Sequence, residues 1–159
     1  MLVLKRYLGT AGAVVLLTAG CGQTVQMQPF EAQANTEEPC AALVADLPDT
    51  LLGADRATIR PESNVMAAWG DPPIGLRCGV PRPSGLERDS ALTDIGEEEG
   101  EIVSWLAQPE DAPTMFIAVH REAYVELSVP SSYGNPAAAL SQVSELIPKH
   151  LEERADSGV

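Results

Sequence analysis

Two hairpin signals constrain this chain's fold more than any other feature of the sequence. Residues 63–80 read SNVMAAWG-DPP-IGLRCGV, two apolar segments on either side of Asp71-Pro72-Pro73, which is a strong turn signal. Residues 114–129 repeat the arrangement around His120-Arg121-Glu122. In the last arm, apolar and polar residues alternate with the period of a strand that has one face in water: Val125, Glu126, Leu127, Ser128 and Val129. Both stretches therefore predict antiparallel hairpins.

A helix is predicted on either side of these strands. The first begins near Thr36, a candidate cap before an acidic first turn, and ends before Pro48. The second begins at Asn135 as its cap, with Pro136 in the first position. Its apolar residues recur at helical spacing: Leu140, Val143, Ile147 and Leu151. We expect Pro148 to kink or divide this helix near Ile147.

The order of elements indicates the fold class. Residues 102–107, which contain Trp105, are a further predicted strand, and residues 81–100 resemble a loop. Helix, about five strands and helix predict an α+β fold, an antiparallel sheet with both helices on one face. We expect a single domain over residues 37–153, followed by a disordered tail over residues 154–159.

The N-terminal segment predicts export. Lys5 and Arg6 precede a mostly apolar run without charge, and Thr18-Ala19-Gly20 leads into Cys21. This is the layout of a secretory signal, and the run is shorter than the roughly 20 residues that span a bilayer. The sequence LTAGC resembles a lipobox, so we expect residues 1–20 to be removed and Cys21 to carry lipid. The alternatives are ordinary secretion and an uncleaved anchor.

The remaining chain is strongly acidic. The first 20 residues hold two of the 10 basic and none of the 23 acidic residues, so the rest carries 8 minus 23, or −15. Such a charge argues against nucleic acid and against docking on anionic lipid headgroups. We expect contact with the membrane only through the lipid. Residues 21–36, polar and rich in Gln, are predicted to be a flexible tether with a reach of roughly 20 Å.

Cys40 and Cys78 remain once Cys21 is assigned to lipid. Two cysteines in an exported domain are expected to form a disulfide. Free thiols and metal ligation are the alternatives, and two distant cysteines without a histidine cluster make a poor metal site.

Residues 68–80, AWGDPPIGLRCGV, resemble the signature of an actinobacterial lipoprotein family known only as domain of unknown function 3515. The lipobox, the early Cys40, the Trp105 strand and the terminal helix fit the same outline over roughly residues 37–152. Gly75 departs from it, since a larger apolar residue is expected there, and so does the Glu-rich segment before Trp105. The resemblance implies a place in the cell envelope and implies no activity. Low Lys beside higher Arg, with abundant Ala, Gly and Pro, favours an actinobacterial source, in which the lipid would lie in the outer face of the cytoplasmic membrane.

Four residues form the candidate binding surface: Trp69, Asp71, Arg77 and Trp105. Trp69, Arg77 and the turn could line a cleft for a ligand or a partner strand. The alternative, which we favour, is that Trp69 packs in the core and the prolines only shape the turn, because large aromatic side chains usually serve packing.

No residue pattern indicates catalysis. His120 and His150, the two histidines, are expected on the surface, and no Gly-x-Ser-x-Gly motif selects a nucleophile. Glu97, Glu98, Glu99 and Glu101 lack the spacing of a calcium loop. We therefore expect no cofactor and no metal. The favoured function is a non-enzymatic binding or accessory domain that contacts an envelope protein or a cell-wall component. The alternative is a small wall-directed hydrolase that uses acidic residues.

Overall fold

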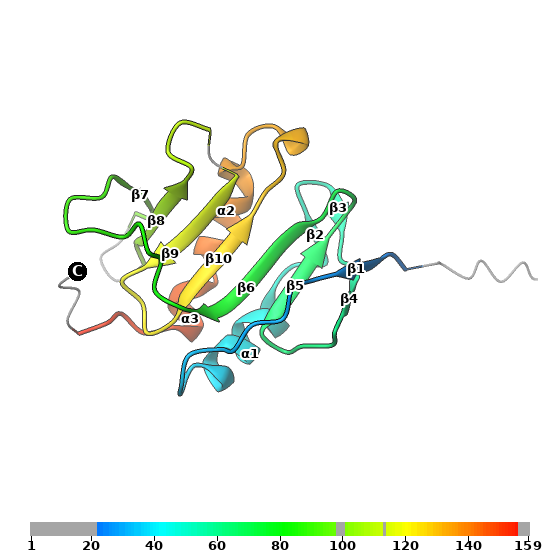
Figure 1. The fold of residues 1–159 in the computed structure, drawn as a ribbon, viewed down its shortest axis with the longest axis horizontal. Coiled ribbons are helices and arrows are strands. Elements are labelled where there is room, and N and C mark those ends of the chain that lie inside the picture. The colour runs from blue at the N-terminus through cyan, green and yellow to red at the C-terminus, as the bar shows by residue number, and fades with distance from the viewer. Residues whose placement is uncertain (1–21, 98–100, 113, 156–159) are drawn as a thin grey trace, which may run out of the picture.

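The computed structural model describes residues 22–97, 101–112 and 114–155. Figure 1 shows a twisted sheet with helices behind it and an N-terminal segment running along its front. In chain order the elements are β1 (Thr24–Gln26), α1 (Glu37–Asp46), β2 (Thr50–Leu51), β3 (Ala54–Asp55), β4 (Thr58–Arg60), β5 (Met66–Trp69), β6 (Ile74–Val80), β7 (Leu92–Ile95), β8 (Val103–Gln108), β9 (Met115–Val119), β10 (Tyr124–Ser128), the 3-10 helix η1 (Ser131–Tyr133), α2 (Ala137–Ser144) and α3 (Ile147–His150).

The main sheet has six antiparallel strands in the order β5-β6-β10-β9-β8-β7. Both predicted hairpins are confirmed, as β5–β6 and β9–β10. The additional strand is β7, which lies within the segment predicted to be a loop and pairs with β8. Its four residues are all exposed or half-buried, so they lack the apolar alternation that reveals a strand in a sequence. The strands β1 to β4 also escaped prediction, because each has only two or three residues and is too short to show a period.

Both predicted helices are present, and the second divides as the sequence predicts. α1 follows Thr36, and α2 is separated from α3 close to Pro148, which lies in the first turn of α3. α2 begins one residue later than predicted, with Pro136 at the N-cap, although Oδ1 of Asn135 accepts a hydrogen bond of 2.9 Å from the backbone N–H of Ala137. All three helices pack on the same face of the sheet, which confirms the α+β architecture.

The core lies between these helices and the sheet. Residues from α1, α2 and α3 meet inward-facing residues of the strands in one buried cluster, which includes Leu43, Val44, Trp69, Leu76, Trp105, Val125, Leu127, Leu140, Val143 and Ile147. The predicted disulfide between Cys40 and Cys78 is present and joins α1 to β6 within this cluster. It therefore links the helical layer to the sheet covalently.

Arg56 holds the C-terminal end of α1. Its Nη1 donates to the carbonyl oxygen of Leu47 at 2.9 Å and its Nη2 to that of Val44 at 2.7 Å. These carbonyls have no partner inside the helix, and a cation is favoured at that end of the helix dipole. The guanidinium also lies 5.7 Å from the centroid of the Trp69 ring. Burial lowers the pKa of Arg56, while the nearby charge of Asp49 acts in the opposite direction.

The prediction of a flexible tether over residues 21–36 is wrong from β1 onward. β1 pairs in parallel with β4, and the backbone N–H of Gln33 donates to the carbonyl oxygen of Gly79 at 2.9 Å. Val25 is buried, with 6% of its surface exposed. Apolar side chains are sparse in this segment, so its sequence shows no period, yet Met27 and Phe30 pack against the buried clusters of the domain. We call residues 24–36 the strap.

The C-terminal boundary also differs from the expectation of a disordered tail over residues 154–159. The backbone N–H of Arg154 donates to the carbonyl oxygen of His120 at 3.0 Å. Its Nη1 donates to the hydroxyl of Tyr124 at 2.9 Å, and its guanidinium lies 4.7 Å from the centroid of that ring. Arg154 is therefore part of the domain, while residues 156–159 lie outside the described part of the chain.

Gly70 marks the close approach of three elements at the end of β5. Its φ is +67°, and a Cβ at this position would lie 2.7 Å from the Cβ of Ala54 and would also overlap the hydroxyl of Tyr133. We expect Gly70→Ala to lower the free energy of unfolding by about 2 kcal/mol, from left-handed backbone strain together with overlap. Urea denaturation measures the loss.

Gly53→Ala is the matched control. Gly53 has a similar φ of +78°, but no described atom lies within 4 Å of the position its Cβ would take. Only the backbone strain remains, so we expect a loss of about 1 kcal/mol. Equal losses in the two variants would show that the contacts of Gly70 contribute nothing.

Candidate ligand-binding groove

The sheet has a second face, turned away from the helices, which the strap covers in part. Along β6, Leu76 and Cys78 point into the core, while Gly75 and Arg77 point to this second face. Along β10, Val125 and Leu127 point into the core and Glu126 points outward. The alternation follows from the period of a strand. Gly75, Arg77 and Glu126 therefore share the second face.

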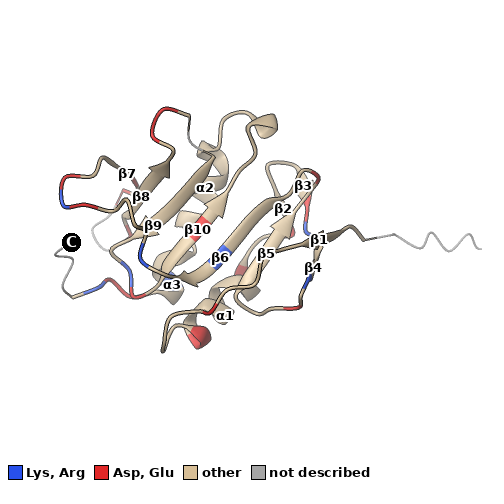
Figure 2. Cartoon of the chain, in the orientation of Figure 1, with Lys and Arg blue, Asp and Glu red and all other residues tan. Residues whose placement is uncertain are grey.

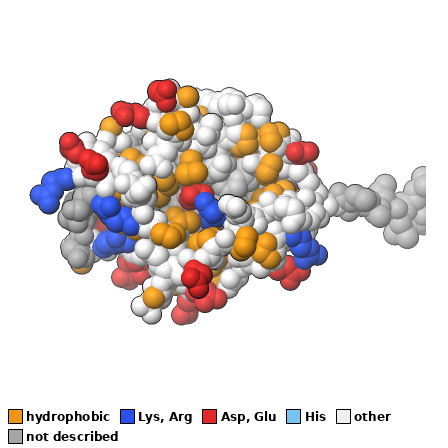
Figure 3. All heavy atoms as spheres, viewed as in Figure 1, with side chains coloured by type: hydrophobic (Ala, Val, Ile, Leu, Met, Phe, Trp, Pro, Cys, Tyr) orange, Lys and Arg blue, Asp and Glu red, His pale blue; other side chains and the backbone are white. Residues whose placement is uncertain are grey.

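An ion pair lies near the middle of this face. Arg77 and Glu126 are directly opposite each other on β6 and β10. The Nε of Arg77 lies 2.8 Å and its Nη2 2.6 Å from Oε1 of Glu126. The two side chains are 26% and 13% exposed. Arg77 is the basic residue of β6 and Glu126 the acidic residue of β10, and Figure 2 shows these colours on the two strands. Figure 3 shows basic and acidic side chains near the middle of this face with hydrophobic side chains around them.

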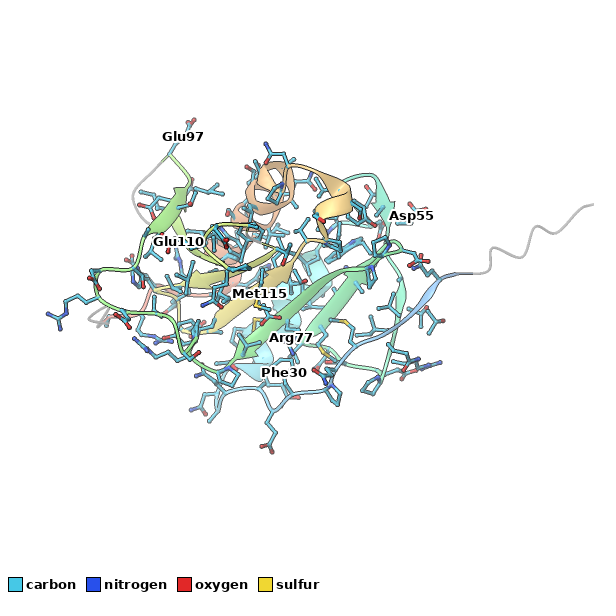
Figure 4. All side chains as sticks on the ribbon, turned by 45° about the horizontal axis from the view of Figure 1, so that its top comes forward. Phe30, Asp55, Arg77, Glu97, Glu110 and Met115 are labelled. Atoms are coloured by element: carbon cyan, nitrogen blue, oxygen red, sulfur yellow. A yellow bond between two sulfur atoms is a disulfide. The ribbon has the colours of Figure 1, made fainter. Side chains whose placement is uncertain are left out.

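The strap forms one wall beside the ion pair. The guanidinium of Arg77 lies over the ring of Phe30, 5.6 Å from the ring centroid. Met27 lies over Gly75, where an added Cβ would be 3.4 Å from the methionine Cε. A larger side chain at Gly75 would therefore contact the flexible end of Met27. Figure 4 shows Phe30, Arg77 and Met115, which come from the strap, β6 and β9, following one another across the sheet.

Two hollows adjoin the ion pair and share Arg77, Met115 and Glu126 as lining residues. The first has a volume of about 280 Å³ and is also lined by Met27, Gln28, Ala68, Pro73, Gly75 and Ser128. The second has a volume of about 210 Å³ and is also lined by Phe30, Val80, Pro81, Pro83, Gln108 and Ile117. We call the two hollows together the groove. It is mostly apolar with a few polar groups, which is the composition typical of ligand sites.

Comparison with known proteins identifies the family. Residues 7–155 match the family described as protein of unknown function (DUF3515). The chain belongs to this family. The matched range contains the strap, every strand and Arg154, so the family extends over the whole described DUF3515 domain. No curated protein and no solved structure matches the chain.

Both tryptophans of the predicted binding surface lie in the core of the DUF3515 domain. Trp69 is 0% and Trp105 1% exposed. The Nε1 of Trp69 donates to the carbonyl oxygen of Pro48 at 2.9 Å, and that of Trp105 donates to Oγ of Ser144 at 2.9 Å. Each ring is thus buried with a hydrogen-bond acceptor for its indole N–H. Both tryptophans are unavailable to a ligand in the folded domain, so their inclusion in the binding surface is corrected.

The other two residues of the predicted binding surface, Asp71 and Arg77, lie in different places. Asp71 is exposed in the β5–β6 turn, and Arg77 lies in the groove. Only Arg77 of the four predicted residues therefore lines the groove. Glu126, Met115 and Phe30 were missed. The alternation in β10 placed Glu126 on a wet face, but nothing local indicates that β10 lies beside β6, and Phe30 fell within the predicted tether.

The histidines are half-buried and not exposed as expected. His120 has a φ of +64° in the β9–β10 turn, and its Nε2 is buried without a hydrogen-bond partner among the described residues. The Nε2 of His150 lies 2.7 Å from Oδ2 of Asp46, so it connects α3 to α1. Neither histidine lines the groove. The contact with Asp46 indicates a structural role for His150.

Two predicted features lie wholly or partly outside the described residues: Cys21, and Glu98 and Glu99 of the acidic run. Within residues 22–97, 101–112 and 114–155, no group of three or more His, Cys, Asp or Glu side chains is arranged to hold a metal ion. Within the same ranges, no helix is long and apolar enough to cross a membrane. A larger hollow of about 590 Å³ beside α2 has Glu97 and Glu101 among its lining residues.

The coupling between Arg77 and Glu126 is directly measurable. Arg77→Ala or Glu126→Ala leaves a half-buried charge without its partner, whereas the double variant removes both charges. We expect each single variant to lose roughly 1–2 kcal/mol and the pair to show a coupling energy of about 1 kcal/mol. Urea denaturation of the four proteins gives this value. Strictly additive losses would show that the pair contributes no interaction energy.

Proposed function

We propose that this DUF3515 protein is a lipid-anchored, extracytoplasmic binding domain of the cell envelope that holds an extended segment of another envelope protein in the groove. The observation that carries the proposal is the groove itself, two adjoining hollows on a sheet face with one ion pair between them. The opposite face of the sheet is covered by the helices and forms the core, whereas this second face leaves the ion pair and its apolar neighbours accessible to a ligand.

The location is supported by sequence and by the disulfide. The signal layout and the LTAGC sequence that ends at Cys21 favour lipidation of an exported chain. A buried disulfide between Cys40 and Cys78 suits an oxidising compartment. The composition, low in Lys beside Arg and rich in Ala, Gly and Pro, favours an actinobacterial source. In such a cell the lipid would insert into the outer leaflet of the cytoplasmic membrane.

The chemistry of the groove favours a peptide. Arg77 uses Nε and Nη2 toward Oε1 of Glu126, and no described residue bonds to Nη1 or Oε2. A peptide unit offers a carbonyl acceptor and an N–H donor, which match these two groups without adding charge. A carboxylate would be repelled by Glu126 and by the acidic surface. Methionine and proline side chains around the pair suit apolar side chains of the bound segment.

The hydrolase alternative receives no support from the groove. Glycoside hydrolysis requires two carboxyl groups on either side of the scissile bond. Glu126 is the one carboxylate among the described residues that line the groove, and it is paired with Arg77. The geometry therefore favours binding over hydrolysis at this site.

Site-specific photocrosslinking in cells tests the groove. Gln28 is exposed and lines the first hollow, while Gln142 is exposed on α2, on the other face of the sheet. With a photoreactive amino acid at position 28, we expect a discrete adduct to an envelope protein that is lost with Arg77→Ala. The same probe at position 142 should give no such adduct. Identical adducts from both positions, or an adduct to wall polymer from position 28, would overturn the peptide proposal.

The lipid anchor is tested separately. We expect Cys21→Ala to abolish acylation, measured by mass spectrometry of the intact protein, and to release the protein from the membrane fraction. Two or three acyl chains at about 0.8 kcal/mol per buried methylene hold a protein on a membrane almost permanently, so the change should be complete. A Cys21→Ala protein that still sedimented with membranes would contradict the anchor.

A further inference from the structure

The described part of the chain begins at Gly22, directly after the proposed lipid site. β1 starts at Thr24, three residues after Cys21, and pairs in parallel with β4. The carbonyl oxygen of Gln23 accepts a hydrogen bond of 2.8 Å from the backbone N–H of Thr58. The side chain of Gln23 donates to the carbonyl oxygen of Gly70 at 2.6 Å. The backbone is thus bonded to the domain from Gln23 onward.

This leaves a very short connection between lipid and domain. A fully extended chain covers about 3.5 Å for each residue, so Cys21 lies within roughly 10 Å of Thr24 whatever its conformation. The tether predicted from the sequence had an average reach of roughly 20 Å. A domain of this size held within such a distance by one end cannot turn freely above the bilayer.

The elements around Thr24 define one end of the molecule. Gln23 contacts Gly70, which precedes the turn at Asp71, and the hydroxyl of Tyr133 donates to the carbonyl oxygen of Pro72 in that turn at 2.9 Å. We call the β5–β6 turn together with Gln23 the anchor end. In Figure 1, β1 and this turn lie at one end, while β7 and the loop before it lie at the other. Figure 4 shows Asp55 and Glu97 at these opposite ends.

We propose that the anchor end faces the lipid surface of the membrane and that the β7 end points away from it. The inference rests on the proposed lipid on Cys21, and the orientation comes from the short connection rather than from attraction by charge. Glu97 and Glu101 of the acidic run lie by the β7 end, where distance from anionic headgroups lowers their repulsion.

The orientation also places the groove relative to the bilayer. Its first hollow is lined by Val25, Gln26 and Pro73, which belong to β1 and the β5–β6 turn at the anchor end. Its second hollow is lined by Pro81 and Pro83, toward the loop that leads to β7. A bound segment would therefore run from near the membrane surface outward. This favours the juxtamembrane segment of a membrane protein as the occupant.

Energy transfer from the protein to the membrane surface tests the orientation. The acylated protein is placed in lipid vesicles that carry an acceptor dye on a headgroup, with a donor dye on Asp71→Cys or Asp89→Cys. Both aspartates are exposed, Asp71 at the anchor end and Asp89 in the loop before β7. The disulfide and the acylated Cys21 leave the new thiol as the one to label. We expect severalfold greater transfer from position 71.

A matched insertion identifies the cause. Fifteen Gly and Ser residues placed between Gly22 and Gln23 add an average reach of roughly 20 Å and leave every described contact of the domain in place. With the insertion, we expect the energy transfer from position 71 and from position 89 to become similar. Equal transfer in the protein without the insertion would overturn the proposed orientation. A protein that mass spectrometry shows to lack acyl chains, and that stays off the vesicles, would overturn the lipid anchor itself.

Discussion

Replacing Cys40 and Cys78 together by alanine is expected to lower the free energy of unfolding by about 4 kcal/mol. The disulfide joins residues 38 positions apart, so its loss frees a long loop in the unfolded chain. It also removes the covalent link between α1 and β6, and both cysteines are 0% exposed. A loss of this size is a large fraction of the stability of a single domain.

Urea denaturation of the double variant measures this loss, and reduction of the natural protein offers a matched comparison. Reduced protein keeps both sulfur atoms in the core and loses only the bond, so it should lose most of the same stability. If the double variant lost several kcal/mol and the reduced protein almost nothing, packing of the sulfur atoms would account for the effect instead. If neither changed, the disulfide would contribute nothing to stability.

Trp69→Ala is expected to lower the free energy of unfolding by roughly 3–5 kcal/mol. The ring is 0% exposed and belongs to the core cluster, its Nε1 donates to the carbonyl oxygen of Pro48, and the guanidinium of Arg56 lies beside it. Truncation leaves a cavity and deprives both groups of a partner. Thermal or urea unfolding detects the loss.

Trp69→Phe separates the contributions, because it keeps most of the buried ring and removes the hydrogen bond to Pro48. We expect it to lose about 1–2 kcal/mol. Because Trp69 faces the core and Gln28 lines the groove, crosslinking from position 28 should persist in the folded Trp69→Phe protein. If Trp69→Phe left the stability unchanged but abolished crosslinking from position 28, Trp69 would have to contribute to binding.

Prediction from the sequence succeeded where local pattern determines structure. The turn at Asp71-Pro72-Pro73, the alternation through Leu127 and the helical spacing of Leu140 and Val143 each involve residues that are neighbours in the chain. Their periods of 2 and 3.6 decide strand or helix before any tertiary contact forms. β7 was missed because its residues are exposed or half-buried, so no apolar period distinguishes it from a loop.

The candidate site was accessible from sequence only in part. Arg77 was selected for its place in a distinctive hairpin, and Trp69 and Trp105 were included because aromatic side chains serve both ligand binding and packing. Which of these roles an aromatic ring has depends on the face of the sheet that it occupies. That face is set by the helices packed against it, and so by residues far away in the chain.

The sequence by itself determined the hairpins, the helices, the α+β class and the pairing expected of Cys40 and Cys78. Tertiary structure alone decided that β6 lies beside β10, which brings Arg77 and Glu126 together across 49 residues. It also decided that residues 24–36 are a strap along the sheet and not a tether. The physical reason is that periodicity shows which side of a strand is apolar, whereas the choice of neighbouring strand depends on packing of the whole chain.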